Sequence, residues 1–157
     1  GERIGTVHIS VEATTVGSGI LLSQDVDIYE GETAAETVVR MLQNNGYSVD
    51  YTGNYETGFY LARISSESNF VTGNIPEDLR TKLEEHGFEI YDFTPNSLGD
   101  YDFTKGSGWM YQVNGVYPNY GLSDYCFQNG DTLRLRFTLA YGADIGQDMT
   151  GGSDNWI

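Results

Sequence analysis

The sequence predicts an α+β domain in which one main helix packs on a mostly antiparallel sheet. Segments with strand periodicity outnumber helical segments, and the helical segments do not alternate regularly with them as a parallel sheet requires. Two tight-turn signals, Asn114-Gly115 and Asn129-Gly130, lie beside strand-like segments, which is typical of antiparallel strands. A length of 157 residues without an internal repeat or a second core indicates one domain.

Strand periodicity is clearest near the N-terminus, over residues 4–13. Its alternate residues are apolar and would share one buried face: Val7, Ile9, Val11 and Ala13. A glycine-rich turn at 17–19 follows, and residues 20–22 and 26–29 are predicted as two short strands. A further strand is expected over 59–64, after a segment rich in glycine and tyrosine.

The main helix is predicted over residues 33–45. Thr33 and Glu36 have the spacing of a capping box, in which side chain and backbone satisfy each other's free donors, and Asn45-Gly46 provides a left-handed end. The apolar stripe of this helix consists of Val38, Val39 and Leu42. We expect that stripe to pack on the apolar face of the first strand.

Residues 65–105 are predicted to add a second helix and a strand. Pro76 suits the first turn of a helix, because its missing N–H is not needed there, and Gly87 would end that helix. Alternation over 88–93 predicts a strand, and 95–108 is expected to be a polar loop.

The C-terminal third carries the remaining strands and a tail. Residues 109–113 are predicted to enter a hairpin turn at Asn114-Gly115, and a long strand is expected over 132–141. Residues 1–141 therefore form the predicted domain. Residues 142–157 are predicted to be an acidic, glycine-rich tail that is loose or laid over the surface.

The charge balance argues against two classes of partner. With 8 basic and 23 acidic residues, the net charge is −15, and nucleic acid must be met by a basic patch. Anionic membrane surfaces are disfavoured for the same reason. No apolar run approaches the length of a membrane span, so membrane insertion is not expected. A lone Cys126 cannot form an internal disulfide, and we expect it to be a packed free thiol.

The motif search favours a protein that is not an enzyme. The sequence lacks the nucleophile elbow, the phosphate-binding loop and the paired-histidine zinc helix, and it holds only two histidines. We therefore name no catalytic residue and no metal ligand, and expect no required cofactor.

Calcium is the one metal ion for which the sequence contains part of a binding pattern. Asp100 and Asp102 begin a pattern with the oxygen spacing of a calcium loop. Its glycine comes one place late, at Gly106, and Tyr111 stands where a bidentate glutamate is needed. An ordinary polar turn is the favoured interpretation.

The candidate ligand-binding residues come from an unusual density of aromatic residues between Trp109 and Phe127. Tyrosine offers a large apolar face with one polar handle, which suits recognition surfaces. For Trp109 and Tyr111 the alternatives of core and binding surface stay open, whereas Tyr117 and Tyr120 are predicted to form an exposed rim. The complete candidate set is Trp109, Tyr111, Gln112, Tyr117, Pro118, Asn119, Tyr120 and Leu122, with Gln112 and Asn119 as polar anchors.

The run G-W-x-Y-x-V-N-G at 108–115, with a later Gly-Asp pair at 130–131, resembles the DUF4430 family. This family is also described as the transcobalamin-like C-terminal domain and is common in secreted and surface proteins of Gram-positive bacteria. The resemblance implies a β-grasp-like fold, into which this chain inserts the helix and strand of 65–105. It also implies a relation to the small β domain of animal cobalamin carriers, which covers one face of the corrinoid.

The sequence therefore favours a non-enzymatic extracellular or surface-anchored binding module, with cobalamin, another corrinoid or a similar small molecule as ligand. The alternative is a cell-surface adhesion or structural module whose aromatic hairpin face docks a protein or glycan. A calcium-dependent or hydrolytic role is disfavoured by the motif search.

Overall fold

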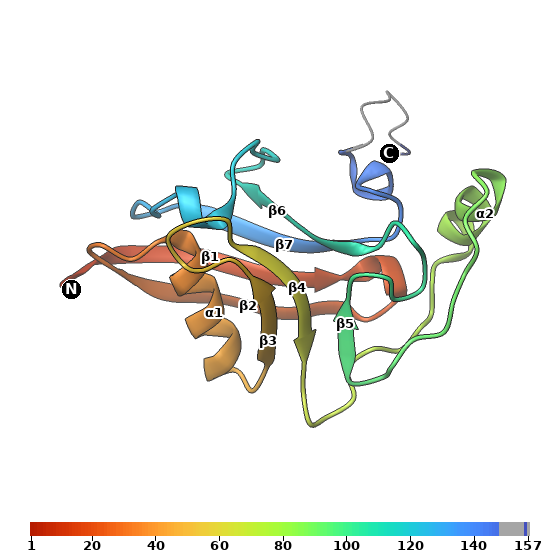
Figure 1. Ribbon diagram of the computed structural model, residues 1–157, viewed down its shortest axis with the longest axis horizontal. Coiled ribbons are helices and arrows are strands. Elements are labelled where there is room, and N and C mark those ends of the chain that lie inside the picture. The colour runs from red at the N-terminus through yellow and green to blue at the C-terminus, as the bar shows by residue number, and fades with distance from the viewer. Residues whose placement is uncertain (148–155, 157) are drawn as a thin grey trace.

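The larger of two sheets in the computed structural model, which describes residues 1–147 and 156, has the strand order β2-β1-β7-β6 (Figure 1). Its strands are β1 (Arg3–Ala13), β2 (Gly19–Tyr29), β6 (Gly108–Val113) and β7 (Thr132–Thr138). The pairs β1–β2 and β6–β7 are antiparallel, whereas β1 and β7 are parallel. First and last strands thus lie side by side at the centre, and the predicted α+β, β-grasp-like class is confirmed.

Helix α1 (Ala34–Asn44) begins and ends as predicted. The hydroxyl of Thr33 accepts from the backbone N–H of Glu36, and Gly46 has a left-handed φ of 87° after the last turn. The stripe Val38, Val39 and Leu42 is buried in the same apolar cluster as Val7, Ile9 and Val11. The main core therefore lies between α1 and the larger sheet.

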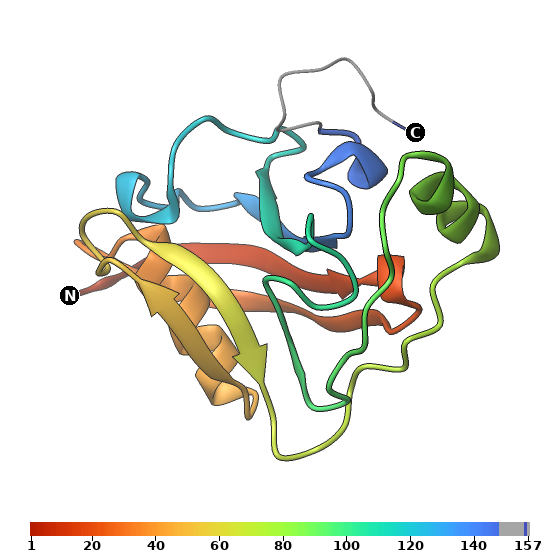
Figure 2. The ribbon, with the colours of Figure 1, turned by 45° about the vertical axis from the view of Figure 1, so that its right-hand side comes forward.

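A smaller antiparallel sheet lies beside α1 and has the order β3-β4-β5 (Figures 1 and 2). It consists of β3 (Ser48–Thr52), β4 (Tyr60–Ser65) and β5 (Ser97–Gly99). Only β4 was predicted. β3 falls in the glycine- and tyrosine-rich segment, and β5 falls in the expected polar loop.

The inserted segment contains the predicted second helix, and its strand is β5 at 97–99 instead of the one predicted over 88–93. Helix α2 (Glu77–Glu85) follows Pro76, and Leu83 on it is fully buried. It lies at the opposite end of the molecule from α1 (Figures 1 and 2). The strand expected over 88–93 is wrong, because the apolar side chains there pack without a neighbouring strand: Phe93 stacks on Phe103 with ring centroids 4.8 Å apart.

Several boundaries also differ from expectation. Residues 20–22 and 26–29 belong to one continuous strand, since β1 pairs along its whole length with β2. Asn114 and Gly115 form the expected turn with positive φ values of 51° and 83°. The hairpin that this turn closes consists of one bridge, between Val113 and Val116. Along the rest of its length β6 pairs with β7 instead.

The described start of the predicted tail is packed. Residues Ala143–Ile145 form a buried 3₁₀ turn, and the Asp144 carboxylate accepts hydrogen bonds from the Thr138 hydroxyl and the Leu139 N–H. Residues 148–155 and 157 of that tail lie outside the described residues. Cys126 is exposed rather than packed. In the described part of the chain, neither helix has the length and apolar character to cross a bilayer.

Candidate ligand-binding cavity

A cavity of about 520 Å³ opens between β6, the start of β4 and the loop 117–122. Seven of the eight candidate residues line it: Trp109, Tyr111, Tyr117, Pro118, Asn119, Tyr120 and Leu122. Among the described lining residues none is lysine, arginine, histidine, aspartate or glutamate. The aromatic cluster of the sequence therefore surrounds one uncharged hollow.

Two glycines allow the walls of this cavity to approach one another. A Cβ atom on Gly106 would lie 2.9 Å from the ring of Phe88 and 3.0 Å from that of Tyr141. On Gly108 it would lie 3.0 Å from a carboxylate oxygen of Asp100. Because a side chain at either position would require these neighbours to shift, the glycines let aromatic and acidic side chains lie close to the strand.

Trp109 lines the cavity and belongs to the core. Its side chain is buried, the indole N–H donates to the Leu98 carbonyl at 3.0 Å, and the ring meets Phe137 edge-on with centroids 5.2 Å apart. Tyrosine and tryptophan rings with such a satisfied polar atom can pack tightly and still present one edge. Trp109 is therefore both a core residue and a residue that lines the cavity.

Tyr111 is half-buried, and its hydroxyl donates to the backbone carbonyl of Tyr120. Burial, with nearby Tyr120 and Asp124, raises the pKa of Tyr111 to about 12. The phenol is therefore neutral at physiological pH, and its bond links strand β6 to the loop 117–122.

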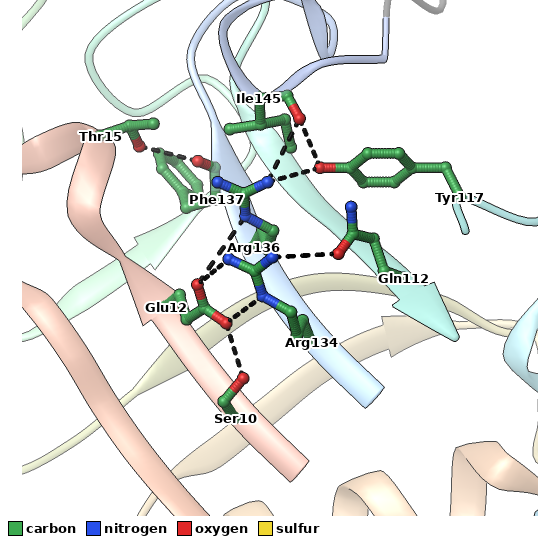
Figure 3. Close-up of polar contacts among 9 residues, drawn as sticks. All are labelled: Ser10, Glu12, Thr15, Gln112, Tyr117, Arg134, Arg136, Phe137 and Ile145. Atoms are coloured by element: carbon green, nitrogen blue, oxygen red, sulfur yellow. Dashed lines mark hydrogen bonds and ion pairs between the residues drawn. The ribbon is translucent and has the colours of Figure 1, made fainter. Parts of the chain in front are cut away.

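Tyr117 is also half-buried and anchored, in contrast to the exposed rim that was expected (Figure 3). Its hydroxyl donates to the Ile145 carbonyl at 2.6 Å and accepts from Nη1 of Arg136 at 2.9 Å. The same guanidinium nitrogen donates to the Ile145 carbonyl at 3.2 Å. This triangle ties the loop to β7 and to the turn 143–145.

Behind this triangle lies a buried carboxylate on the polar face of β1 (Figure 3). Glu12 accepts two hydrogen bonds from Arg134 at 2.7 and 2.8 Å and one from Ser10 at 2.6 Å, and Nε of Arg136 is 3.8 Å away. The hydrogen bonds from Arg134 lower the pKa of Glu12, which keeps it ionised.

Gln112 is the one candidate residue that does not line the cavity. It alternates with Tyr111 along β6, and its carbonyl oxygen accepts from Nη1 of Arg134 at 3.2 Å (Figure 3). The structure thus places it in the polar network on β1 and β7.

Other lining residues were missed, above all Phe59, Tyr60 and Tyr141. Phe59 directly precedes β4, Tyr60 is its first residue, and Tyr141 follows β7. The Tyr60 hydroxyl donates to both oxygens of Asp100, at 2.8 and 2.9 Å. Only their aromatic character marks them in the sequence, since their approach to the cavity depends on how the two sheets meet.

The acidic pair that resembles a calcium loop is engaged with protein groups. Asp100 accepts from Tyr60, while Asp102 accepts from Arg63 at 2.7 Å and from the Gly99 N–H at 2.8 Å. Within the described residues, no group of three or more histidine, cysteine, aspartate or glutamate side chains is placed to hold a metal ion.

The comparisons with known proteins bear on the segment that carries most of this cavity. Residues 87–138 match the model of DUF4430, a domain of unknown function. The match covers about a third of the chain, including β6, β7 and the loop between them, and it confirms the resemblance to DUF4430 there. No curated protein matches the chain.

Two solved structures are similar to the chain at low identity. A candidate metal-binding protein from Ruminococcus gnavus ATCC 29149 is 13% identical with a TM-score of 0.43, over 87% of this chain and 99% of that one. Haptocorrin in complex with Cbi is 11% identical with a TM-score of 0.44, over 88% of this chain and 26% of that one. At these values the likeness says nothing about the ligand of this chain.

Proposed function

We propose that this chain is a non-enzymatic binding module whose cavity takes a flat, partly apolar small molecule, with a corrinoid as the first candidate. The observation that carries the proposal is that seven residues of β6 and the loop 117–122 line one largely apolar, uncharged cavity. Its volume of about 520 Å³ falls in the range typical of small-molecule sites, which are mostly apolar with a few polar anchors. A ligand as large as a corrinoid would be only partly enclosed.

The polar anchors available to such a ligand include peptide groups of β6. The N–H of Asn114 donates to Thr132 on β7, while the N–H of Val113 turns the other way, to Val116. Because peptide groups alternate along an antiparallel strand, those of Trp109 and Tyr111 also point away from β7. Because β6 is the edge strand of the larger sheet, these two groups face away from its one partner strand there and can pair with amide groups of a ligand.

The chemistry of the lining supports binding rather than catalysis. The titratable groups among the described lining residues are phenols, and general acid–base catalysis draws mainly on histidine, carboxylates and lysine. An extracellular or surface-anchored setting in a Gram-positive bacterium is inferred from the resemblance to DUF4430 and is part of the same proposal.

The alternative is an adhesion module that docks a protein or glycan. Exposed rings beside the cavity favour it: Tyr60 is 46% exposed, and Tyr101, which lies close enough to influence the pKa of Tyr60, is 73% exposed. Such rings can stack on sugar or protein surfaces.

A titration separates the two functions. The whole chain is titrated with dicyanocobinamide and cyanocobalamin by absorbance, and against a glycan panel in parallel. We expect corrinoid binding at micromolar Kd or weaker, about −8 kcal/mol or less favourable, because a partial enclosure buries little of the ligand. Tyr120→Ala should weaken it at least about tenfold, whereas the distant Tyr91→Ala should not. Glycan binding without corrinoid binding would favour the alternative.

A further inference from the structure

One end of the cavity is rich in electrons, and no described lining residue of the cavity is basic. Tyr60, Tyr111 and Tyr120 line this end. The segment before β4 and the loop 117–122 meet at this end. The Phe59 N–H donates to the hydroxyl of Ser123, the residue directly after that loop.

Two of the three phenol hydrogens at this end point into the protein. Tyr111 donates to the Tyr120 carbonyl, and Tyr60 donates to the Asp100 carboxylate. Since a phenol has a single hydrogen to donate, these two groups can offer a ligand only ring surface and oxygen lone pairs. Both features attract donors and cations and disfavour anions.

Carboxylates lie behind these rings. Asp100 is next to Tyr60 and within 3.0 Å of the position that a Cβ on Gly108 would take. Asp124 accepts from the Gly121 N–H at 3.2 Å and contributes to the raised pKa of Tyr111. Two acidic groups therefore lie close to the aromatic end.

Three arginines near the cavity are already paired, and Lys105, which precedes the lining residue Gly106, is exposed. Arg63, which reaches the Asp100 carbonyl, forms an ion pair of 2.7 Å with Asp102. Arg134 and Arg136 lie at the other end, around Glu12 and Tyr117. A charge of −15 on the whole chain adds to the attraction of a cationic ligand.

We propose that the Tyr60–Tyr111–Tyr120 end of the cavity binds an alkylated ammonium group of an organic cation. The proposal rests on the cavity being a ligand site, and it names a class of ligand other than a corrinoid. Aromatic rings attract such groups through the negative face of the ring, and a site with its own carboxylates strengthens that attraction. The opposite end, with Thr138 and Gln147, would hold the uncharged polar part.

The test compares choline with 3,3-dimethylbutan-1-ol, which has the same shape with carbon in place of nitrogen. Binding of both to the whole chain is measured by isothermal titration and by tryptophan fluorescence, since Trp109 lines the cavity. We expect choline to bind at least about tenfold more tightly than the neutral probe, as a desolvated cation–π contact would give. Acetate, as an anionic probe, should not bind.

Two variants and their matched controls locate the site. Tyr120→Leu keeps an apolar side chain without a π face, and Asp124→Asn keeps the acceptor for the Gly121 N–H without its charge. Both should weaken choline binding, the second by a few-fold and only at low salt. Tyr91→Leu and Glu84→Gln, which lie outside the cavity, should leave it unchanged.

Equal affinities for choline and its neutral analogue would overturn the inference, as would the absence of binding by choline. Loss of affinity in Tyr91→Leu equal to that in Tyr120→Leu would also overturn it. Each of these results leaves the corrinoid titration to decide the proposed function, because that assay uses a different probe and signal.

Discussion

Removing one hydroxyl from Tyr117 should destabilise the fold, although its ring was expected to form an exposed rim. In Tyr117→Phe the Ile145 carbonyl loses a donor at 2.6 Å, and Arg136 loses an acceptor at 2.9 Å. These two groups keep their own bond of 3.2 Å, so neither is left wholly unpaired. The expected loss for the two bonds together is about 1–2 kcal/mol, because both partners stay hydrogen-bonded to each other.

Urea denaturation followed by fluorescence measures this loss, which corresponds to a melting temperature lower by about 2–8 °C for a chain of this size. Tyr120→Phe is the matched control, because no hydrogen bond of its hydroxyl is found among the described residues. It should change stability by less than about 0.5 kcal/mol. The reasoning is refuted if Tyr117→Phe unfolds like the wild type, or if both variants lose the same amount.

Three other expectations concern stability. Leu42→Ala should cost about 2–5 kcal/mol in urea denaturation, since Leu42 is fully buried in the main core; a cost near zero would contradict that packing. Gly142→Ala should destabilise more than Gly115→Ala: both glycines have left-handed φ, but only at Gly142 would the new Cβ meet the Gln147 carbonyl, so equal losses would argue against the packed turn. Glu12 has a lowered pKa in the folded protein. Its contribution to the free energy of unfolding is therefore present above about pH 4.5 and is lost as the pH falls through the lowered pKa. Glu12→Gln should be less stable at pH 7 and lose less stability between about pH 5 and pH 2, and an unchanged acid profile would show that Glu12 is not the group that titrates.

Local patterns predicted the elements that local physics decides. Alternation along 4–13 identified β1, and Thr33 with Glu36 identified the start of α1 to within one residue. The density of aromatic residues from Trp109 onward led to the cavity, because rings close together in the chain stay close when one strand and its following loop carry them.

The features that the sequence did not predict depend on packing between segments far apart in the chain. Residues 88–93 alternate like a strand, yet the edge of β4 pairs with 97–99, where Arg63 faces Gly99. Tyr117 looked like an exposed loop residue because its partners, Arg136 and Ile145, are 19 and 28 positions away. Sequence spacing gives no sign of such contacts.

The position of bound ligand tests the central claim most directly. Dicyanocobinamide is added to ¹⁵N-labelled protein, and amide chemical shifts are followed through the titration. We expect the largest changes at Trp109, Tyr111 and Gly121, whose backbones border the cavity, with β3 and α2 unaffected. Changes confined to β3 or α2, or no change at millimolar ligand, would contradict the claim that this cavity is a binding site.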